Sequence, residues 1–84
     1  MNKIIVFGTG KDSRTLVKWL SKIKTEIICF TDNNADKWTE TFYGKPIISP
    51  DFVPNKDFDY VIVATTTYWK PIRKQLLKYG IPIN

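Results

Sequence analysis

Residues 4–13 read Ile-Ile-Val-Phe-Gly-Thr-Gly-Lys-Asp-Ser, and this stretch decides the fold of the chain. Its first four residues form an unbroken apolar run, which is typical of a parallel strand buried on both faces. Gly8 and Gly10 follow directly and can form a sharp turn, because glycine adopts backbone conformations that other residues rarely reach. A helix is expected to begin near Asp12 or Ser13, since either side chain can cap a first turn. The stretch therefore predicts a buried strand, a tight turn and a helix.

The alternation of strands and helices continues along the chain. Further apolar strands are predicted at residues 26–31 and 58–64, and a short extended piece at 45–48. That piece is expected either to lie at a sheet edge or to be mostly unpaired at Pro46, because Pro46 lacks the N–H group that a strand ladder needs. Alternating strands and helices indicate a parallel sheet with right-handed crossovers. The sequence therefore predicts the α/β class: a small Rossmann-like open parallel sheet with three main strands, short edge strands, and helices on both faces.

The glycine turn also resembles a motif that binds phosphate groups. Residues 8–13, Gly-Thr-Gly-Lys-Asp-Ser, follow the pattern G-x-G-x-x-G, with Ser13 in place of the third glycine. In this motif the backbone approaches a pyrophosphate, and the start of the following helix supplies N–H groups and a positive dipole end. Asp32 lies just past the second predicted strand, where a carboxylate accepts hydrogen bonds from ribose hydroxyls and disfavours a 2′-phosphate. The spacing therefore predicts a site for a nucleotide-type ligand.

The candidate binding residues follow the three main strands, whose carboxyl ends share one edge of a parallel sheet. Hydroxyl and amide groups at this edge can contact a phosphate or a sugar. The threonines at residues 65–67 can equally cap the turn into the last helix. Tyr68 and Trp69 can stack on a base or a sugar ring, or serve as core or oligomer contacts. The predicted cofactor-binding residues are Gly8, Thr9, Gly10, Lys11, Ser13, Asp32, Asn33, Thr65 and Thr66. The leading candidates for the ligand are NAD(P) and a nucleotide sugar, and the sequence does not distinguish these from S-adenosylmethionine.

Groups that commonly perform catalysis are scarce. The chain contains no His, and its single Cys29 lies in an apolar strand, where burial disfavours the reactive thiolate. The sequence contains no G-x-x-x-x-G-K-S/T phosphate loop and no Cys/His cluster of the kind that binds zinc. We therefore predict no catalytic residue and no metal site within these positions, and no turnover by the isolated domain.

Composition limits the class of protein. The 84 residues fit one domain, and a hydrophobic share of 43% is that of an ordinary globular chain. The net charge of +5 is dispersed over helices with an apolar stripe opposite, so we expect no nucleic-acid binding. No apolar stretch approaches the roughly 20 residues that span a bilayer, and a lone cysteine suits a reducing compartment. The expectation is a cytoplasmic domain without membrane insertion.

Several segments together resemble one known type of domain. They are residues 3–10, residues 29–34 with Lys37 and Trp38, residues 43–50 and residues 59–64. Over nearly its whole length the chain is similar to the small Rossmann-like domain at the N-terminus of capsular-type nucleotide-sugar epimerases and dehydratases. Related accessory domains accompany acyl-, methyl- and glycosyltransferases of surface-polysaccharide synthesis. The acyltransferases usually carry a His after the glycine turn, where this chain has Lys-Asp-Ser at residues 11–13.

The resemblance implies that Gly8, Gly10 and Asp32 contact a cofactor or a nucleotide sugar. The leading hypothesis is a nucleotide-binding accessory module, residues 1–84, of a polysaccharide-biosynthesis enzyme such as a glycosyltransferase or a sugar epimerase. Its partners would be the rest of a longer polypeptide or further copies of itself, because residues 81–84 look like the start of another strand. The alternative is a non-catalytic oligomerisation or interaction domain with a vestigial pocket, in which Ser13 or an aromatic side chain fills the crevice.

Overall fold

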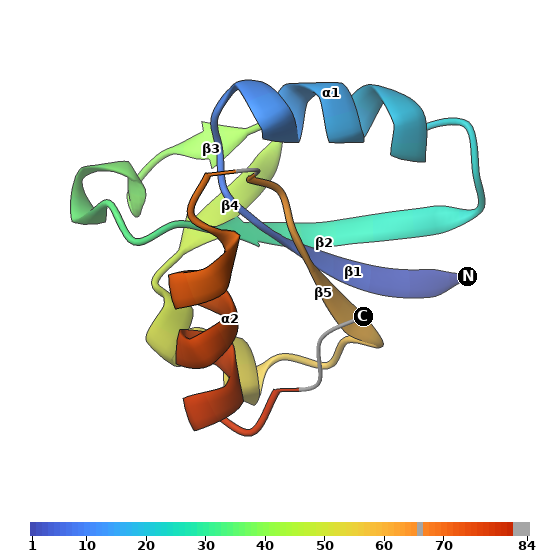
Figure 1. The fold of residues 1–84 in the computed structure, drawn as a ribbon. Coiled ribbons are helices and arrows are strands. Elements are labelled where there is room, and N and C mark those ends of the chain that lie inside the picture. Colours follow the sequence, from blue (N-terminus) through green and yellow to red (C-terminus); the bar gives the residue numbers. More distant parts are fainter. Residues whose placement is uncertain (66, 82–84) are drawn as a thin grey trace.

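Strands and helices alternate along the chain in the computed structural model, which describes residues 1–65 and 67–81 (Figure 1). Two α-helices, two short 3₁₀ helices (η) and five strands are present in this part of the chain. In chain order they are β1 (Asn2–Phe7), α1 (Lys11–Leu20), β2 (Thr25–Thr31), η1 (Ala35–Lys37), β3 (Thr41–Phe42), β4 (Lys45–Ile48), η2 (Pro50–Asn55), β5 (Tyr60–Val63) and α2 (Trp69–Lys78).

The strands form one sheet in the order β3-β4-β2-β1-β5. β1 pairs in parallel with both β2 and β5, and β2 pairs in parallel with β4. The four parallel strands, numbered along the chain, therefore lie in the order 3-2-1-4, which is the arrangement of a doubly wound Rossmann sheet. The predicted α/β class and Rossmann-like parallel sheet are confirmed. From β1 the chain adds β2 and β4 on one side, and it then returns to add β5 on the other side of β1.

Helices cover both faces of the sheet, with α1 on one face and α2 and η2 on the other (Figure 1). Successive residues of β1 point to opposite faces, so its unbroken apolar run supplies both cores. The core beneath α1 contains Ile4, Val6, Leu20, Phe30 and Ile47. The core beneath α2 and η2 contains Ile5, Phe7, Cys29, Val53, Val61, Ile72, Leu76 and Ile81.

Some predicted element boundaries are wrong. The N-cap residue of α1 is Gly10, and no side chain caps this helix, so the expected cap by Asp12 or Ser13 is not formed. β4 is not at the sheet edge, because β3 pairs outside it and places Thr41 opposite Pro46. On its other side Pro46 is unpaired, since the pairs between β2 and β4 are at Ile47 and Ile48. The third main strand is the shorter β5, Tyr60–Val63, and the strand start expected at residues 81–84 falls largely on 82–84, outside the described residues.

Cys29 is buried within the core beneath α2, as the sequence predicts. Burial raises the pKa of its thiol, and the charge of Lys56 lowers that pKa by a smaller amount. Less thiolate is therefore present at neutral pH than at an exposed cysteine. This places the side chain among the packing residues of the sheet.

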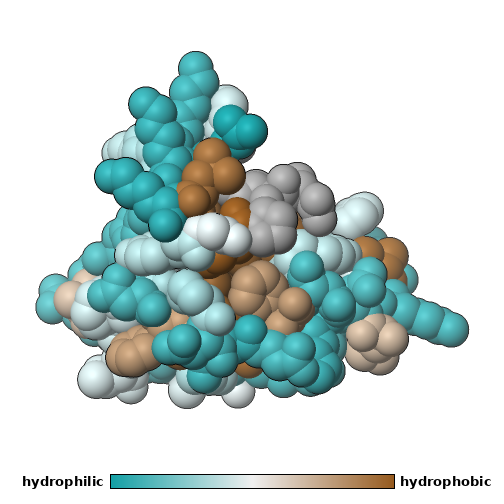
Figure 2. Space-filling view, turned by 90° about the horizontal axis from the view of Figure 1, so that it is seen from below, coloured by the Kyte–Doolittle hydropathy of each residue, from teal (hydrophilic) through white to brown (hydrophobic). Residues whose placement is uncertain are grey.

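The face of the molecule that Figure 2 shows is mostly hydrophilic. Seen from below the view of Figure 1, charged and polar residues cover most of the face, and apolar residues form smaller patches between them (Figure 2). Among residues 1–65 and 67–81, no helix has the length and apolar character needed to cross a membrane.

Candidate functional site

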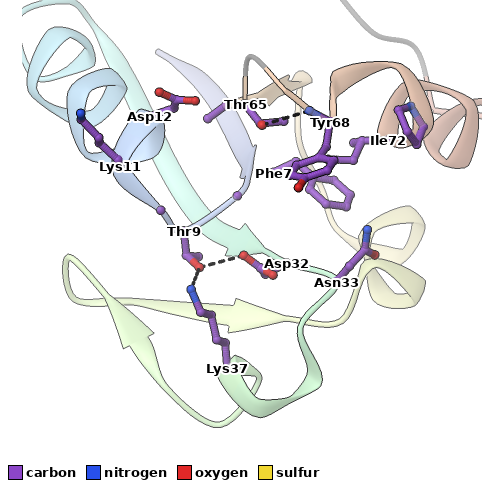
Figure 3. A pocket seen from close by; sticks show the side chains of 14 residues that line it. Phe7, Thr9, Lys11, Asp12, Asp32, Asn33, Lys37, Thr65, Tyr68 and Ile72 are labelled. Carbon is purple, nitrogen blue, oxygen red and sulfur yellow. Dashed lines mark hydrogen bonds between the residues drawn. The ribbon is translucent and has the colours of Figure 1, made fainter.

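A cavity of about 520 Å³ opens at the carboxyl edge of the sheet (Figure 3). Its walls come from the β1–α1 turn, from the end of β2 with η1, and from the connection between β5 and α2. The lining residues are Phe7, Gly8, Thr9, Gly10, Lys11, Asp12, Asp32, Asn33, Lys37, Ala64, Thr65, Tyr68, Pro71 and Ile72. This is the place where the chain changes direction across the sheet, and ligands of open α/β sheets commonly bind at such a point.

Most of the binding residues predicted from the sequence meet around this cavity. Ser13 does not line it, and Thr66 lies outside the described residues. The predicted residues that do line the cavity are Gly8, Thr9, Gly10, Lys11, Asp32, Asn33 and Thr65.

The two glycines of the turn have different roles. Gly8 has a φ of +120°, and a Cβ atom there would lie 3.1 Å from Ser13 Oγ and 3.2 Å from the carbonyl oxygen of Ala64. Gly10 has a φ of −103°, a value open to any residue. A Cβ atom at Gly10 would meet no heavy atom of the described chain within 4 Å. The fold therefore needs glycine at position 8, whereas the space beside Gly10 is open.

Ser13 packs the start of α1 against the exit of β1. Its side chain is fully buried, and its hydroxyl donates to the carbonyl oxygen of Gly8 at 2.6 Å. The third glycine of the motif normally permits close packing of helix on strand. Here a small side chain is accommodated because it hydrogen-bonds to the turn itself. Ser13 fills space behind the turn, and we leave it out of the candidate site.

Asp32 lies at the end of β2 and faces the glycine turn. Its carboxylate accepts hydrogen bonds from the Thr9 hydroxyl at 2.8 Å and from the backbone N–H of Asn34 at 2.9 Å. The ammonium group of Lys37 donates to the same Thr9 hydroxyl at 3.0 Å, and Figure 3 shows Thr9 between the two charged side chains. The Trp38 indole donates to the backbone carbonyl of Asp32 at 2.6 Å, which fixes this bend of the chain.

Two predicted residues use their side chains to connect elements around the cavity. The side-chain amides of Asn33 and Gln75 form two reciprocal hydrogen bonds of 3.1 and 2.9 Å, which link the end of β2 to α2. The hydroxyl of Thr65 accepts from the backbone N–H groups of Thr67 and Tyr68 at 3.3 Å each. Thr65 therefore caps the turn into α2, which is one of the two roles the sequence left open for the threonines.

Sequence reasoning did not assign Lys37 to the site, although this residue belongs to the segment that carried the resemblance. Its contact with Thr9 depends on the bend between β2 and η1, and that bend has no periodic signal. The aromatic pair separates: Tyr68 lines the cavity and is 66% exposed, whereas Trp69 is not part of the lining. In the described part of the chain, no three His, Cys, Asp or Glu side chains are grouped so as to hold a metal ion.

The cavity offers different chemistry along its length. Near Gly10 the first turn of α1 presents backbone N–H groups and the positive end of the helix dipole, which favour an anion. At the end of β2, Asp32 presents acceptor oxygens that favour hydroxyl donors. Phe7 and Ile72 supply apolar surface against which a ring can pack. The arrangement suits a ligand that joins a phosphate, a sugar and a ring.

The fold and site define a small Rossmann-like α/β domain with a cavity at the change of direction of its sheet. The family model described as C2185-like, N-terminal matches residues 1–84, so the chain belongs to that family. Its fold is similar to that of a crystal structure of UDP-D-quinovosamine 4-dehydrogenase from Vibrio fischeri, with a TM-score of 0.79 and 22% sequence identity. That similarity covers 98% of this chain and 75% of the other. No curated protein shows significant sequence similarity to the chain.

Proposed function

We propose that this domain binds a nucleotide-type ligand, either NAD(P) or a nucleotide sugar, in the cavity at the carboxyl edge of the sheet. The observation that carries the proposal is the meeting of the glycine turn, the start of α1 and Asp32 around one cavity of about 520 Å³. In this arrangement the phosphates lie at the first turn of α1 and a ribose lies against Asp32. Tyr68, at the opposite wall, is placed to stack on a ring of the ligand.

We further propose that the domain is an accessory module of an enzyme of surface-polysaccharide biosynthesis, with the catalytic residues located elsewhere in the intact protein. Support comes from the resemblance of its segments to the N-terminal domains of nucleotide-sugar epimerases and dehydratases. The solved structure with the similar fold is named as a 4-dehydrogenase of UDP-D-quinovosamine, which is a UDP-linked sugar, and this agrees with the proposal. The competing hypothesis, an interaction domain with a filled crevice, is less favoured because Ser13 packs behind the turn and leaves the cavity open.

A thermal-shift panel tests the proposed function. NAD⁺, NADP⁺, UDP-glucose and S-adenosylmethionine are each added to the chain, and the melting temperature is recorded over a range of concentrations. A ligand present at 100 times its Kd is expected to add about 2.7 kcal/mol to the free energy of unfolding, which raises the melting temperature measurably. If none of the nucleotides raises the melting temperature at millimolar concentration, the interaction-domain hypothesis replaces this one.

Replacement of Asp32 is expected to weaken ligand binding more than it weakens the fold. Asp32→Ala removes a charged acceptor and should cost about 1.5–3 kcal/mol of binding free energy, measured by isothermal titration calorimetry. Asp32→Asn is the matched control for the fold, because its amide oxygen can still accept from the N–H of Asn34. Equal affinity of the wild type and Asp32→Ala would remove this residue from the site.

A further inference from the structure

Residues 13–25, which form most of α1 and the turn into β2, carry four cations and no acid. The cations are Arg14, Lys18, Lys22 and Lys24. Arg14 lies over the ring of Phe42, 5.8 Å from the ring centroid. The three lysines are exposed and form no ion pair with a carboxylate of the described residues. The end of α1 therefore presents positive charge that the domain itself does not neutralise.

Two large apolar side chains lie exposed among these lysines. Trp19 is 59% exposed and Ile23 is 44% exposed, whereas Leu20 is buried beneath the helix. The N–H of Ile23 donates to the carbonyl oxygen of Leu20 at 3.1 Å, so the helical spiral continues past the end of α1. Residues four apart on such a spiral are neighbours, which brings Trp19 and Ile23 together. We call Lys18, Trp19, Lys22, Ile23 and Lys24 the α1-end patch.

The α1-end patch and the cavity of the candidate site lie at opposite ends of the domain. β1 and β2 begin on the side where α1 ends, and the cavity lies where those strands finish (Figure 1). A partner that contacts the patch therefore leaves the cavity open to its ligand.

The composition of the patch fits the surface of a membrane. Lysines around an exposed tryptophan and an aliphatic side chain are typical of helices that lie in the membrane interface. Each lysine near an anionic leaflet raises the affinity about fivefold, and tryptophan is favoured at the level of the lipid headgroups. A nucleic acid would use the cations but would leave Trp19 and Ile23 facing water. An anionic bilayer uses both kinds of side chain.

α2 also carries exposed cations, but it fits this role less well. Its exposed apolar residues, Trp69 and Leu77, are eight residues apart, which is about 12 Å along a helix. The ammonium group of Lys70 lies 5.5 Å from the centroid of a Trp69 ring and so already occupies that side chain. Because α2 lies on the other face of the sheet, it does not reach a bilayer that contacts α1 (Figure 1).

We propose that the α1-end patch is a peripheral membrane contact, through which the domain binds reversibly to a bilayer that contains anionic lipids. The lysines bind lipid phosphates, and Trp19 and Ile23 enter the headgroup region beside them. A patch of this size gives weak binding, so stable anchoring requires a second contact. The contact uses a different surface from the proposed nucleotide site and does not depend on it.

Flotation with unilamellar vesicles tests the proposal. One set consists of phosphatidylcholine, and the other contains equal parts of phosphatidylcholine and phosphatidylglycerol. Three lysines predict a preference of about a hundredfold for the anionic vesicles, and high salt should abolish most of it. Equal partitioning into both sets, or no binding to either, overturns the proposal and leaves the nucleotide site standing.

Charge variants locate the contact on the molecule. Lys18→Gln combined with Lys22→Gln should weaken binding to the anionic vesicles about 25-fold. Lys74→Gln combined with Lys78→Gln is the matched control, because it removes the same charge from α2. The domain measures 31 × 26 × 24 Å and the Debye length is about 10 Å, so the control should stay within about twofold of the wild type. Equal losses, or a larger loss in the control, mean that the patch is not the contact.

Trp19→Ala separates membrane binding from a general attraction to polyanions. It should weaken binding to the anionic vesicles about tenfold, because the indole no longer enters the headgroup region. Its affinity for heparin, a polyanion without an apolar layer, should not change. Leu77→Ala, on α2, is the control for an exposed apolar side chain and should bind vesicles like the wild type. If Trp19→Ala binds vesicles as tightly as the wild type, the patch attracts polyanions in general and the membrane proposal is wrong.

Discussion

Gly8→Val is expected to lower the free energy of unfolding by about 2–4 kcal/mol, the combined scale of a strained backbone and an overpacked contact. The φ of +120° at Gly8 is one that a β-branched residue rarely adopts. A new Cβ atom would also lie 3.2 Å from the backbone oxygen of Ala64, which belongs to the neighbouring strand connection and cannot rotate away. For a domain of this size, such a loss is a large fraction of total stability.

Urea denaturation followed by circular dichroism measures this effect, and Gly10→Val is the matched control. Both variants introduce the same side chain in the same turn, but a Cβ atom at Gly10 meets no heavy atom of the described residues within 4 Å. The control should lose no more than about 1 kcal/mol, the usual cost of an apolar residue at an N-cap. If the two variants unfold at the same urea concentration, the turn does not have the geometry described above.

Gly10→Val should instead abolish ligand binding while the fold is kept. The position lines the cavity at the start of α1, where a phosphate would approach the backbone. A branched side chain occupies that approach, so affinity for the best ligand of the panel should fall about a hundredfold or more, equivalent to roughly 2.7 kcal/mol.

Calorimetry on folded protein gives the measurement, and Gly10→Ala provides a graded comparison. Its single methyl group should weaken binding less than the two methyl groups of valine. Wild-type affinity in Gly10→Val would show that the ligand does not approach the turn, and the phosphate position would then have to be abandoned.

The predictable part of the fold is the part with a long, uniform pattern. The apolar run of β1 and the following glycines indicated a buried parallel strand and its turn, and both are present. β3 was not predicted, because a strand of two residues is too short to show a hydrophobic periodicity. The edge position considered for residues 45–48 was wrong for the same reason, since the strand that covers them was not visible in the sequence.

In the candidate site, too, residues at a fixed sequence spacing were predicted, whereas contacts between separate elements were not. Asp32 and the glycines were found because the motif fixes their spacing along the chain. The contact of Lys37 with Thr9 spans a bend, and the amide pair of Asn33 and Gln75 joins residues far apart in the sequence. Such contacts depend on how β2, η1 and α2 pack, which no local pattern encodes. Ser13 looked like a defect of the motif and is in fact hydrogen-bonded to the turn.

The central claim is that a nucleotide binds at this cavity, and amide chemical shifts of the ¹⁵N-labelled chain test it most directly. Titration with NAD⁺ or UDP-glucose should shift amides of the glycine turn and of Asp32, Thr65 and Tyr68. A smaller cavity of about 290 Å³, lined in part by Val17 and Tyr43 on the other side of the sheet, serves as the internal reference. Shifts confined to the first group are the expected result; unchanged spectra with both ligands, or shifts centred on the smaller cavity, would contradict the account.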